Sequence, residues 1–217
     1  MLFDPLQFPS GQSMPNRFML APLTNQQSHD DGTLSDAEFH WLTMRAKGGF
    51  GITMTCGVYV SDEGKGFPGQ LGLTHAGHLD GHRRVAKAIK DEGSMAIMQL
   101  IHGGLRALQP KAGGQPLAPS DDDRKGARAM TLEEVHRTRD SFIQAAVWAE
   151  ETGYDGVELH GAHGYLLDQF FWERSNRRED AYGGSLENRI RFAVELVAGV
   201  RVAVGPDFPI LFRFSQW

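Results

Sequence analysis

The sequence predicts an α/β protein in which parallel strands alternate with helices. Five apolar runs have the length and composition of strands, and segments with helical patterns lie between them. The runs are residues 17–21, 51–56, 95–100, 156–160 and 210–214. Strands that alternate with helices along a chain pair in parallel, and the loops at their carboxyl ends line a common crevice. We therefore expect functional side chains at those strand ends.

Composition and charge narrow the class of partner. The chain has 217 residues, of which 41% are hydrophobic and 23% are charged, as in an ordinary globular protein with a sizeable core. The net charge of -5 argues against nucleic acid or an anionic membrane as the main partner, because both attract a basic face. There is no apolar stretch near the ~20 residues of a membrane span and no basic leader before an apolar run. We expect a cytoplasmic protein that acts on small molecules.

The chain has one cysteine, Cys56, at the end of the second predicted strand. One cysteine cannot form an internal disulfide, and by itself it cannot hold a zinc ion or an iron–sulfur cluster. We therefore predict that Cys56 is a small buried apolar residue.

Two helices are predicted from their amino-terminal signatures. The first covers residues 35–47, where Ser35 caps the helix and Glu38 completes a capping box. Thr131 and Glu134 repeat the signature ahead of the fourth strand. The second helix has one apolar face, formed by Val135, Phe142, Ala146 and Ala149.

A long polar insert, residues 102–130, lies between the third strand and the second of these helices. It is rich in glycine, proline and charged residues, and segments of this kind are usually lids or disordered loops. Asp121, Asp122 and Asp123 lie near its middle. Because three consecutive carboxylates diverge and repel one another, we expect a solvated loop tip there rather than a metal site.

The last predicted helix covers residues 186–204 and leads into the fifth strand. Ser185 is its cap, and Gly205 followed by Pro206 ends it. Its apolar stripe consists of Leu186, Ile190, Ala193, Val197 and Val200.

The end of the fourth strand holds the most informative residues of the chain. Val157 and Leu159 alternate with Glu158 and His160, which is the period of a strand, and glycines then stop it. His160, His163 and Tyr165 follow one another within six residues. Three side chains that can donate hydrogen bonds therefore meet at one strand end.

Strand alternation also predicts which polar side chains share the inner face of the sheet. Glu158 faces the same way as His160, whereas Gln99 and Arg213 occupy that face on the third and fifth strands. An unpaired buried polar group costs about 1–3 kcal/mol, so we expect a polar ligand among these groups. Glu158 lies one layer lower and needs a cationic or hydrogen-bonding partner, for which we predict Arg213.

Residues 130–192 resemble the Old Yellow Enzyme family, the FMN-dependent ene reductases. The most specific parts of the match are Asp155-Gly-Val-Glu-Leu-His160-Gly-Ala-His163-Gly-Tyr165 and Asn176-Arg-Arg178-Glu-Asp180-Ala-Tyr182-Gly-Gly-Ser185. Residues 16–24, Gln99 with His102, and residues 117–120 are similar to other motifs of the family. The resemblance covers nearly the whole chain.

The resemblance implies a (β/α)8 TIM barrel that carries FMN across its carboxyl-terminal mouth. Residues 1–217 would be the N-terminal part of a single FMN-binding barrel domain and would supply about its first five strands. Three more strand–helix units and the phosphate-binding loops would follow Trp217, so the chain looks truncated.

Family roles for the flavin follow from the matched positions. Pro22, Leu23 and Thr24 would contact the flavin edge, and Gly57 would let the second strand approach closely. Gln99 and Arg213 would hydrogen-bond the pyrimidine side of the ring system, next to His160. A fixed cation at that place would stabilise the anion that forms on reduction.

Family roles for the reaction fall on the fourth strand end. His160 and His163 would bind the carbonyl oxygen of an α,β-unsaturated substrate, where negative charge develops. Tyr165 would deliver a proton, because a phenol with a reference pKa of about 10 stays protonated at neutral pH. The resemblance thus implies reduction of C=C bonds in enone-type small molecules, with NADH or NADPH as the reductant.

Several alternatives stay open. One is a larger FMN and iron–sulfur enzyme of the dienoyl-CoA reductase type, and another is a non-catalytic barrel fragment that pairs with a second chain. A metal-dependent lyase that uses His160 and His163 is disfavoured, since their spacing is not helical and no third ligand follows, so we predict no metal. The sequence does not decide between a monomer and a homo-oligomer.

Overall fold

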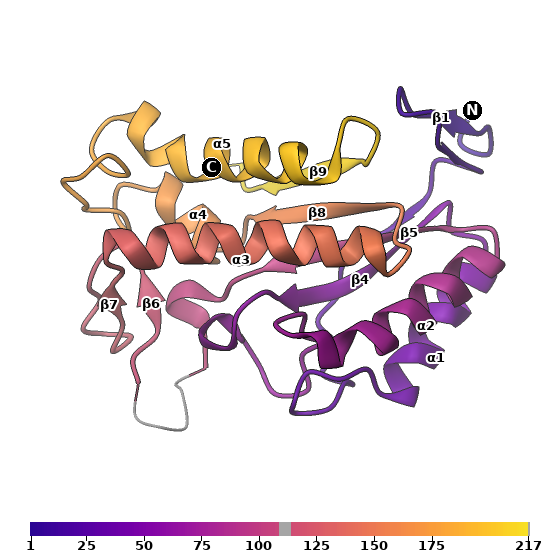
Figure 1. Cartoon of the computed structure of the whole chain (residues 1–217), viewed down its shortest axis with the longest axis horizontal. Helices are drawn as coiled ribbons and strands as arrows, with labels where there is room; N and C mark the ends of the chain where they lie inside the picture. Colours follow the sequence, from indigo (N-terminus) through magenta and orange to yellow (C-terminus); the bar gives the residue numbers. More distant parts are fainter. Residues whose placement is uncertain (109–113, 217) are drawn as a thin grey trace.

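The computed structural model describes residues 1–108 and 114–216, and its centre is a five-stranded parallel sheet (Figure 1). The strand order is β3-β4-β5-β8-β9, in which each strand pairs with its neighbours in chain order. The strands are β3 (Met19–Leu20), β4 (Ile52–Tyr59), β5 (Met95–Ile101), β8 (Gly156–Gly161) and β9 (Ile210–Phe214). The sequence therefore predicted the strands, their order and their parallel pairing correctly.

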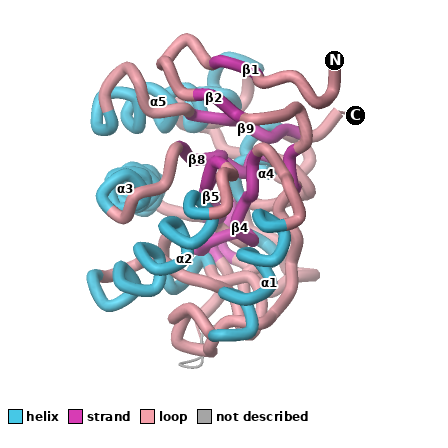
Figure 2. Tube along the Cα trace, turned by 90° about the vertical axis from the view of Figure 1, so that its right-hand side faces the viewer, coloured by secondary structure: helices cyan, strands magenta, loops and turns pink. Residues whose placement is uncertain are grey.

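Helices cover the outer face of the curved sheet, while short elements occupy its ends (Figure 2). The long helices are α1 (Asp36–Lys47), α2 (Leu79–Asp91), α3 (Leu132–Glu151) and α5 (Leu186–Val204). A short helix, α4 (Leu166–Phe171), follows β8 directly. Single 3-10 turns lie at Asp62–Gly64, Ala76–His78 and Gly104–Arg106. This arrangement matches the strand–helix repeat of the predicted barrel, seen here as an open half.

The main hydrophobic core lies between the sheet and the helices. Val157 and Leu159 of β8 are fully buried in it, as strand alternation predicts, together with Phe142 of α3 and Phe192 of α5. Cys56 also belongs to this core, and burial raises the pKa of its thiol well above the ordinary value. The prediction of a buried, structural cysteine is therefore confirmed.

A second, smaller core closes the amino-terminal end of the inner face. It is covered by an antiparallel hairpin of β1 (Leu6–Gln7) and β2 (Ser13–Met14), which the sequence analysis did not predict. Its buried members are Met14, Ile52, Met54, Met95 and Ile97. Leu211 of β9 packs against them, so Ile97 and Leu211 point inward, two residues before Gln99 and Arg213 on the same strands. Apolar residues thus fill the bottom of the half-barrel, and polar residues remain at its top.

The helix caps agree with the sequence analysis except at one residue. Thr131 and Glu134 form the predicted capping box of α3, and Ser185 caps α5. Ser35 caps α1 by accepting a hydrogen bond from the Glu38 backbone N–H. The predicted capping box at α1 is wrong, because the Glu38 carboxylate is buried and accepts hydrogen bonds from Ser28, Asn25 and Cys56 instead.

The insert between β5 and α3 is folded over its described residues. It contains the short parallel strands β6 (Leu117–Ala118) and β7 (Arg128–Ala129). Asp121 and Asp123 are exposed, as predicted for a solvated loop tip, and Asp121 also accepts a hydrogen bond from the Ala129 backbone N–H. Residues 109–113 of the predicted lid or disordered loop lie outside the described residues.

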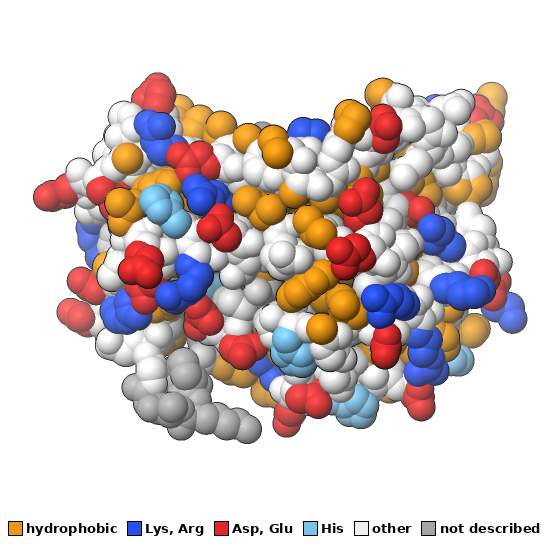
Figure 3. Space-filling model, in the orientation of Figure 1, with side chains coloured by type: hydrophobic (Ala, Val, Ile, Leu, Met, Phe, Trp, Pro, Cys, Tyr) orange, Lys and Arg blue, Asp and Glu red, His pale blue; other side chains and the backbone are white. Residues whose placement is uncertain are grey.

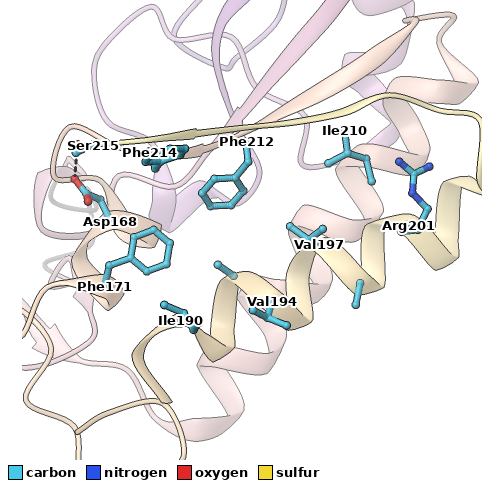
Figure 4. Close-up of a pocket in the computed structure, with 12 residues that line it drawn as sticks. Asp168, Phe171, Ile190, Val194, Val197, Arg201, Ile210, Phe212, Phe214 and Ser215 are labelled. Carbon is cyan, nitrogen blue, oxygen red and sulfur yellow. Dashed lines mark hydrogen bonds between the residues drawn. The ribbon is translucent and has the colours of Figure 1, made fainter. Parts of the chain in front are cut away.

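An apolar groove of about 840 Å³ lies between β9 and α5 (Figure 4). Phe212 and Phe214 of β9 face Ile190, Val194 and Val197 of α5 across it. The predicted stripe of α5 is therefore only partly buried: Ile190 lines the open groove and Leu186 is exposed. The fully packed face of α5 is formed by Phe192, Ala193, Leu196, Val200 and Val204. On the described chain β9 is an edge strand, because it pairs only with β8.

Acidic and basic side chains are interspersed over the face drawn in Figure 3, with apolar patches between them. No large surface of one sign is formed on that face. Among the described helices, none is both long enough and apolar enough to cross a bilayer.

Candidate active site

Side chains from the carboxyl ends of the five parallel strands meet around one narrow cavity of about 70 Å³. It is lined by Pro22, Leu23, Thr24, Gly57, Phe67, Gln99, Ile101, His160, His163, Tyr165 and Arg213. Every residue that the sequence analysis selected for a cofactor or a substrate is among them. Phe67 and Ile101 were missed, because an apolar side chain in a loop or a strand carries no chemical signal of its own.

His160, at the end of β8, is the centre of a cluster of aromatic rings. Its ring centroid lies 5.0 Å from that of His163, at an interplanar angle of 82°, and 5.1 Å from that of Tyr165. Only 4% of His160 is exposed, and its buried Nδ1 has no hydrogen-bond partner among the described residues. A buried polar atom without a partner is costly, so this nitrogen is free to bind a ligand.

The His160 imidazole is uncharged at neutral pH. Burial lowers its pKa to about 3, and the electrostatic effects of His163 and Arg213 act in the same direction. A neutral imidazole has one N–H donor and one acceptor nitrogen. His160 can therefore donate one hydrogen bond to a ligand without itself losing a proton.

Glu158 holds the two polar side chains on the neighbouring strands. It is only 4% exposed, and its Oε1 accepts hydrogen bonds from Gln99 Nε2 at 2.6 Å and from Arg213 Nε at 3.0 Å. Strand register brings them together, since Gln99 pairs with Glu158 and His160 pairs with Arg213. The predicted partner of Glu158 is thus confirmed. Within the described chain, Gln99 Oε1 and the Arg213 Nη atoms make no hydrogen bond.

Gly57 lets β4 and β5 approach each other at an irregularity in the sheet. Met54 pairs with Ile97 but Gly57 pairs with Gln99, so β4 has one more residue than β5 over this stretch. A Cβ atom at Gly57 would lie 3.0 Å from Ile101 Cγ2 and 3.2 Å from Gln99 Oε1. The predicted strand ended at Cys56, whereas β4 continues through the glycine to Tyr59. Gly57 is therefore a point of close contact within a strand and not the end of one.

A wider cavity of about 1150 Å³ adjoins the site and shares His163 with it. Its other charged lining residues include Arg106 and Lys125. The Arg106 guanidinium carbon lies 5.6 Å from the ring centroid of Tyr165. The rings of the aromatic cluster thus stand between a narrow polar cavity and a larger open one, which can admit a small molecule.

Comparison with known proteins decides the family. The sequence model of the NADH:flavin oxidoreductase / NADH oxidase family matches residues 1–217. The chain belongs to this family. The chain is 38% identical over 206 residues to the probable NADH-dependent flavin oxidoreductase YqiG of Bacillus subtilis. That alignment covers 93% of this chain and 55% of the relative.

Solved structures also support the assignment of this chain to the flavin oxidoreductase family. The Old Yellow Enzyme homologue from Zymomonas mobilis superposes with a TM-score of 0.90 at 30% identity, over 98% of this chain and 62% of that chain. A 2-naphthoyl-CoA reductase in complex with 2-naphthoyl-CoA superposes with a TM-score of 0.91 at 35% identity, over 98% of this chain and 35% of that chain. The open sheet of this chain is thus the same half of a TIM barrel that these proteins contain. The chain spans about half the length of the first of these relatives and about a third of the last.

Proposed function

We propose that this chain is the N-terminal part of a single FMN-binding TIM-barrel domain whose enzyme reduces the C=C bond of α,β-unsaturated carbonyl compounds with NADH or NADPH. One observation carries the proposal: the nine residues selected from the sequence line one cavity at the carboxyl ends of five parallel strands. The family supports it, because its members are flavin oxidoreductases. The substrate is a small molecule of the enone type.

The residues present fit a flavin. The pyrimidine side of a flavin has both N–H and carbonyl groups, and it needs acceptors and donors together. Gln99 Oε1 is an acceptor and the Arg213 Nη atoms are donors, and Glu158 holds the other polar atoms of both side chains away. Thr24 and Gly57 line the same cavity and would help to hold the ring system.

Bound FMN would supply the hydride that reduces the carbon β to the carbonyl. His160 and His163 would donate hydrogen bonds to the carbonyl oxygen as negative charge develops on it. His160 suits this role because it is neutral, buried and held beside His163, so its N–H does not need to reorganise. Tyr165, 5.1 Å from His160 between ring centroids, would give its hydroxyl proton to the α-carbon.

The Tyr165→Phe variant tests this assignment in full-length, FMN-loaded protein. We expect the reduction of 2-cyclohexenone to slow by about 10²–10⁴-fold, the usual contribution of a general acid, while flavin reduction by NADH or NADPH stays within about twofold. Stopped-flow absorbance of the flavin follows both half-reactions separately. Tyr154→Phe removes a phenol hydroxyl that hydrogen-bonds His82 outside the cavity and should change neither rate. Equal losses in both half-reactions would exclude Tyr165 as the proton donor.

A larger enzyme with FMN and an iron–sulfur cluster is a second candidate. It is favoured by the similarity to 2-naphthoyl-CoA reductase, of which this chain covers 35% at 35% identity. The absorption spectrum and the iron content of the full-length protein separate the candidates. Flavin bands without iron support the smaller ene reductase, flavin with iron supports the larger enzyme, and a colourless protein without flavin would contradict both.

A further inference from the structure

His163 has a backbone conformation that residues other than glycine rarely adopt. Its φ is 61°, in the left-handed region, and Gly164 follows with φ 71°. A non-glycine residue in this region costs on the order of 1 kcal/mol or more and persists only where its surroundings hold it. Since the His163 side chain lines the cavity, whatever holds this turn also aims the imidazole.

Two side chains outside the aromatic cluster, Ser215 and Asp168, hold the turn. Figure 4 shows the hydrogen bond between these two. The His163 N–H donates to Ser215 Oγ at 3.0 Å, and Ser215 Oγ donates to Asp168 Oδ2 at 3.1 Å. The Gly164 N–H donates to the same Asp168 oxygen at 2.8 Å. Both peptide N–H groups of the left-handed turn are therefore satisfied, one directly and one through a serine hydroxyl.

The chemistry of Asp168 sets the direction of this hydrogen-bond chain. The Ser215 hydroxyl donates its hydrogen bond to Asp168 Oδ2 and presents a lone pair to the His163 N–H. Asp168 is 3% exposed, and among the described residues it forms no ion pair with Lys or Arg. Its contacts with this turn and with Ser215 are thus its main polar interactions.

The same contacts join two strand ends. Asp168 lies in α4, which follows β8, and Ser215 is the first residue after β9. Ser215 lies two residues beyond Arg213, whose guanidinium binds Glu158. A change at Asp168 therefore alters the His163 turn and the end of β9 together.

We propose that Asp168, acting through Ser215, is a positioning residue that holds His163 in the orientation needed to bind the substrate carbonyl oxygen. This inference rests on the proposed function of His163. Asp168 and Ser215 do not touch the substrate; they fix the turn from which His163 reaches it.

The experiment uses full-length, FMN-loaded protein and three variants: Asp168→Asn, Ser215→Ala and Ser215→Thr. Ser215→Ala removes a buried hydrogen bond, and Asp168→Asn replaces the carboxylate with a weaker amide acceptor; each should raise the dissociation constant of 2-cyclohexenone by about tenfold. Ser215→Thr keeps the hydroxyl and should restore binding to within about threefold of the unmodified protein. Reoxidation of the reduced flavin by molecular oxygen needs no carbonyl-binding group and should not change.

A double-mutant cycle separates positioning from a general structural role. If Asp168 acts through His163, Asp168→Asn should have no further effect on enone binding in a His163→Ala background. Equal losses in both backgrounds would overturn the proposal, as would unchanged enone binding in Ser215→Ala. The matched controls are Asp121→Asn, which weakens the acceptor of the Ala129 backbone N–H, and Ser120→Ala, which removes that of the Arg177 backbone N–H. Both lie in another loop, and neither should alter binding.

Hydrogen exchange provides a readout that does not depend on turnover. The amide of His163 should exchange faster in Asp168→Asn and Ser215→Ala than in the unmodified protein, and at an unchanged rate in the two controls. Unaltered exchange in both variants would overturn the proposed chain of contacts even if the enzyme reduces enones. Failure of the unmodified protein to bind FMN or reduce any enone would instead overturn the proposed function, and the role of His163 with it.

Discussion

Glu158 is the carboxylate that offsets the positive charge of Arg213 beside the cavity. It lies between Gln99 and Arg213 on the inner face of the sheet, one layer below His160. Its negative charge offsets that of the guanidinium, and its hydrogen bond turns the Gln99 amide so that the carbonyl oxygen stays available. A cation left without this partner would exert a stronger field on any ligand beside it.

The Glu158→Gln variant should therefore raise the reduction potential of bound FMN. The uncompensated Arg213 would favour the anionic reduced flavin, by on the order of 30 mV for a two-electron couple, or about 1.4 kcal/mol. A spectroscopic redox titration measures the shift. Glu63→Gln, which removes a carboxylate paired with Arg137 on the surface, should leave the potential unchanged. A potential that falls in Glu158→Gln would contradict this account.

At the residue scale, the sequence was informative wherever chemistry and strand period agreed. His160, Gln99 and Arg213 could be placed on one face because residues two apart on a strand point the same way. Asp168 and Ser215 could not be identified, because their contact joins residues separated by 47 positions and depends on a turn with positive φ. No local pattern in the sequence predicts such a turn at a histidine.

Among the helices, the two predicted capping boxes show where local sequence decides the structure of a helix end and where tertiary contacts do. In the described chain the polar contacts of the Thr131 and Glu134 side chains are all within a few residues, with their own helix end, Arg137 and Arg128, so the local signature predicted the outcome. Glu38 has the same spacing from Ser35, but the core of α1 and β4 places Ser28 and Cys56 within its reach. A buried carboxylate that already has three donors does not turn back to its helix cap.

Replacement of the α3 cap tests the local part of this argument. Thr131→Ala removes the acceptor for the Glu134 backbone N–H and should lower the free energy of unfolding by about 0.5–2 kcal/mol. Thr131→Ser keeps the acceptor and should lie close to the unmodified protein. Urea denaturation followed by circular dichroism measures both. Equal stability of the two variants would show that the cap contributes nothing measurable.

The sequence predicted the ends of helices and strands closely where neighbouring residues determine them, and not where contacts with distant residues do. The limits of α5 and β9 match the sequence prediction residue for residue, because Ser185 and Gly205 mark the helix ends. The hairpin of β1 and β2 was not foreseen, since its two-residue strands acquire their order only by covering the second core. The extra residue in β4 was not predicted either, because it is defined by how β4 pairs with β5 and not by the sequence of β4 alone.

At the scale of the whole molecule, three buried histidines make stability depend on pH. Burial lowers the pKa of His82 to about 4 and those of His102 and His160 to about 3. Each pKa lies below the ordinary value of about 6.5, so between these values the unfolded chain binds more protons than the folded one. The free energy of unfolding must therefore fall as the pH falls below about 6.5, and it continues to fall until the pH reaches the folded-state pKa values.

The expected size of this effect is large enough to measure. At pH 5 each of these histidines should lower the free energy of unfolding by on the order of 2 kcal/mol relative to pH 7.5. Urea denaturation at the two pH values measures the total. His82→Gln, at a position that links α2 to the Tyr154 hydroxyl, should reduce the difference between the two pH values. Equal stability at both pH values would show that these imidazoles are not buried in neutral form.

The apolar groove beside β9 has a consequence for the chemistry. Asp168 and Ser215 line this groove on one side and the wider cavity beside the active site on the other, so they form a wall shared by both. A molecule bound against Phe212 and Phe214 would also contact this wall, and we expect a shift of Ser215 to move the backbone of His163 that it holds. The rate of enone reduction should therefore depend on how fully the groove is occupied. When the groove is emptied, this rate should fall before the helices lose their secondary structure.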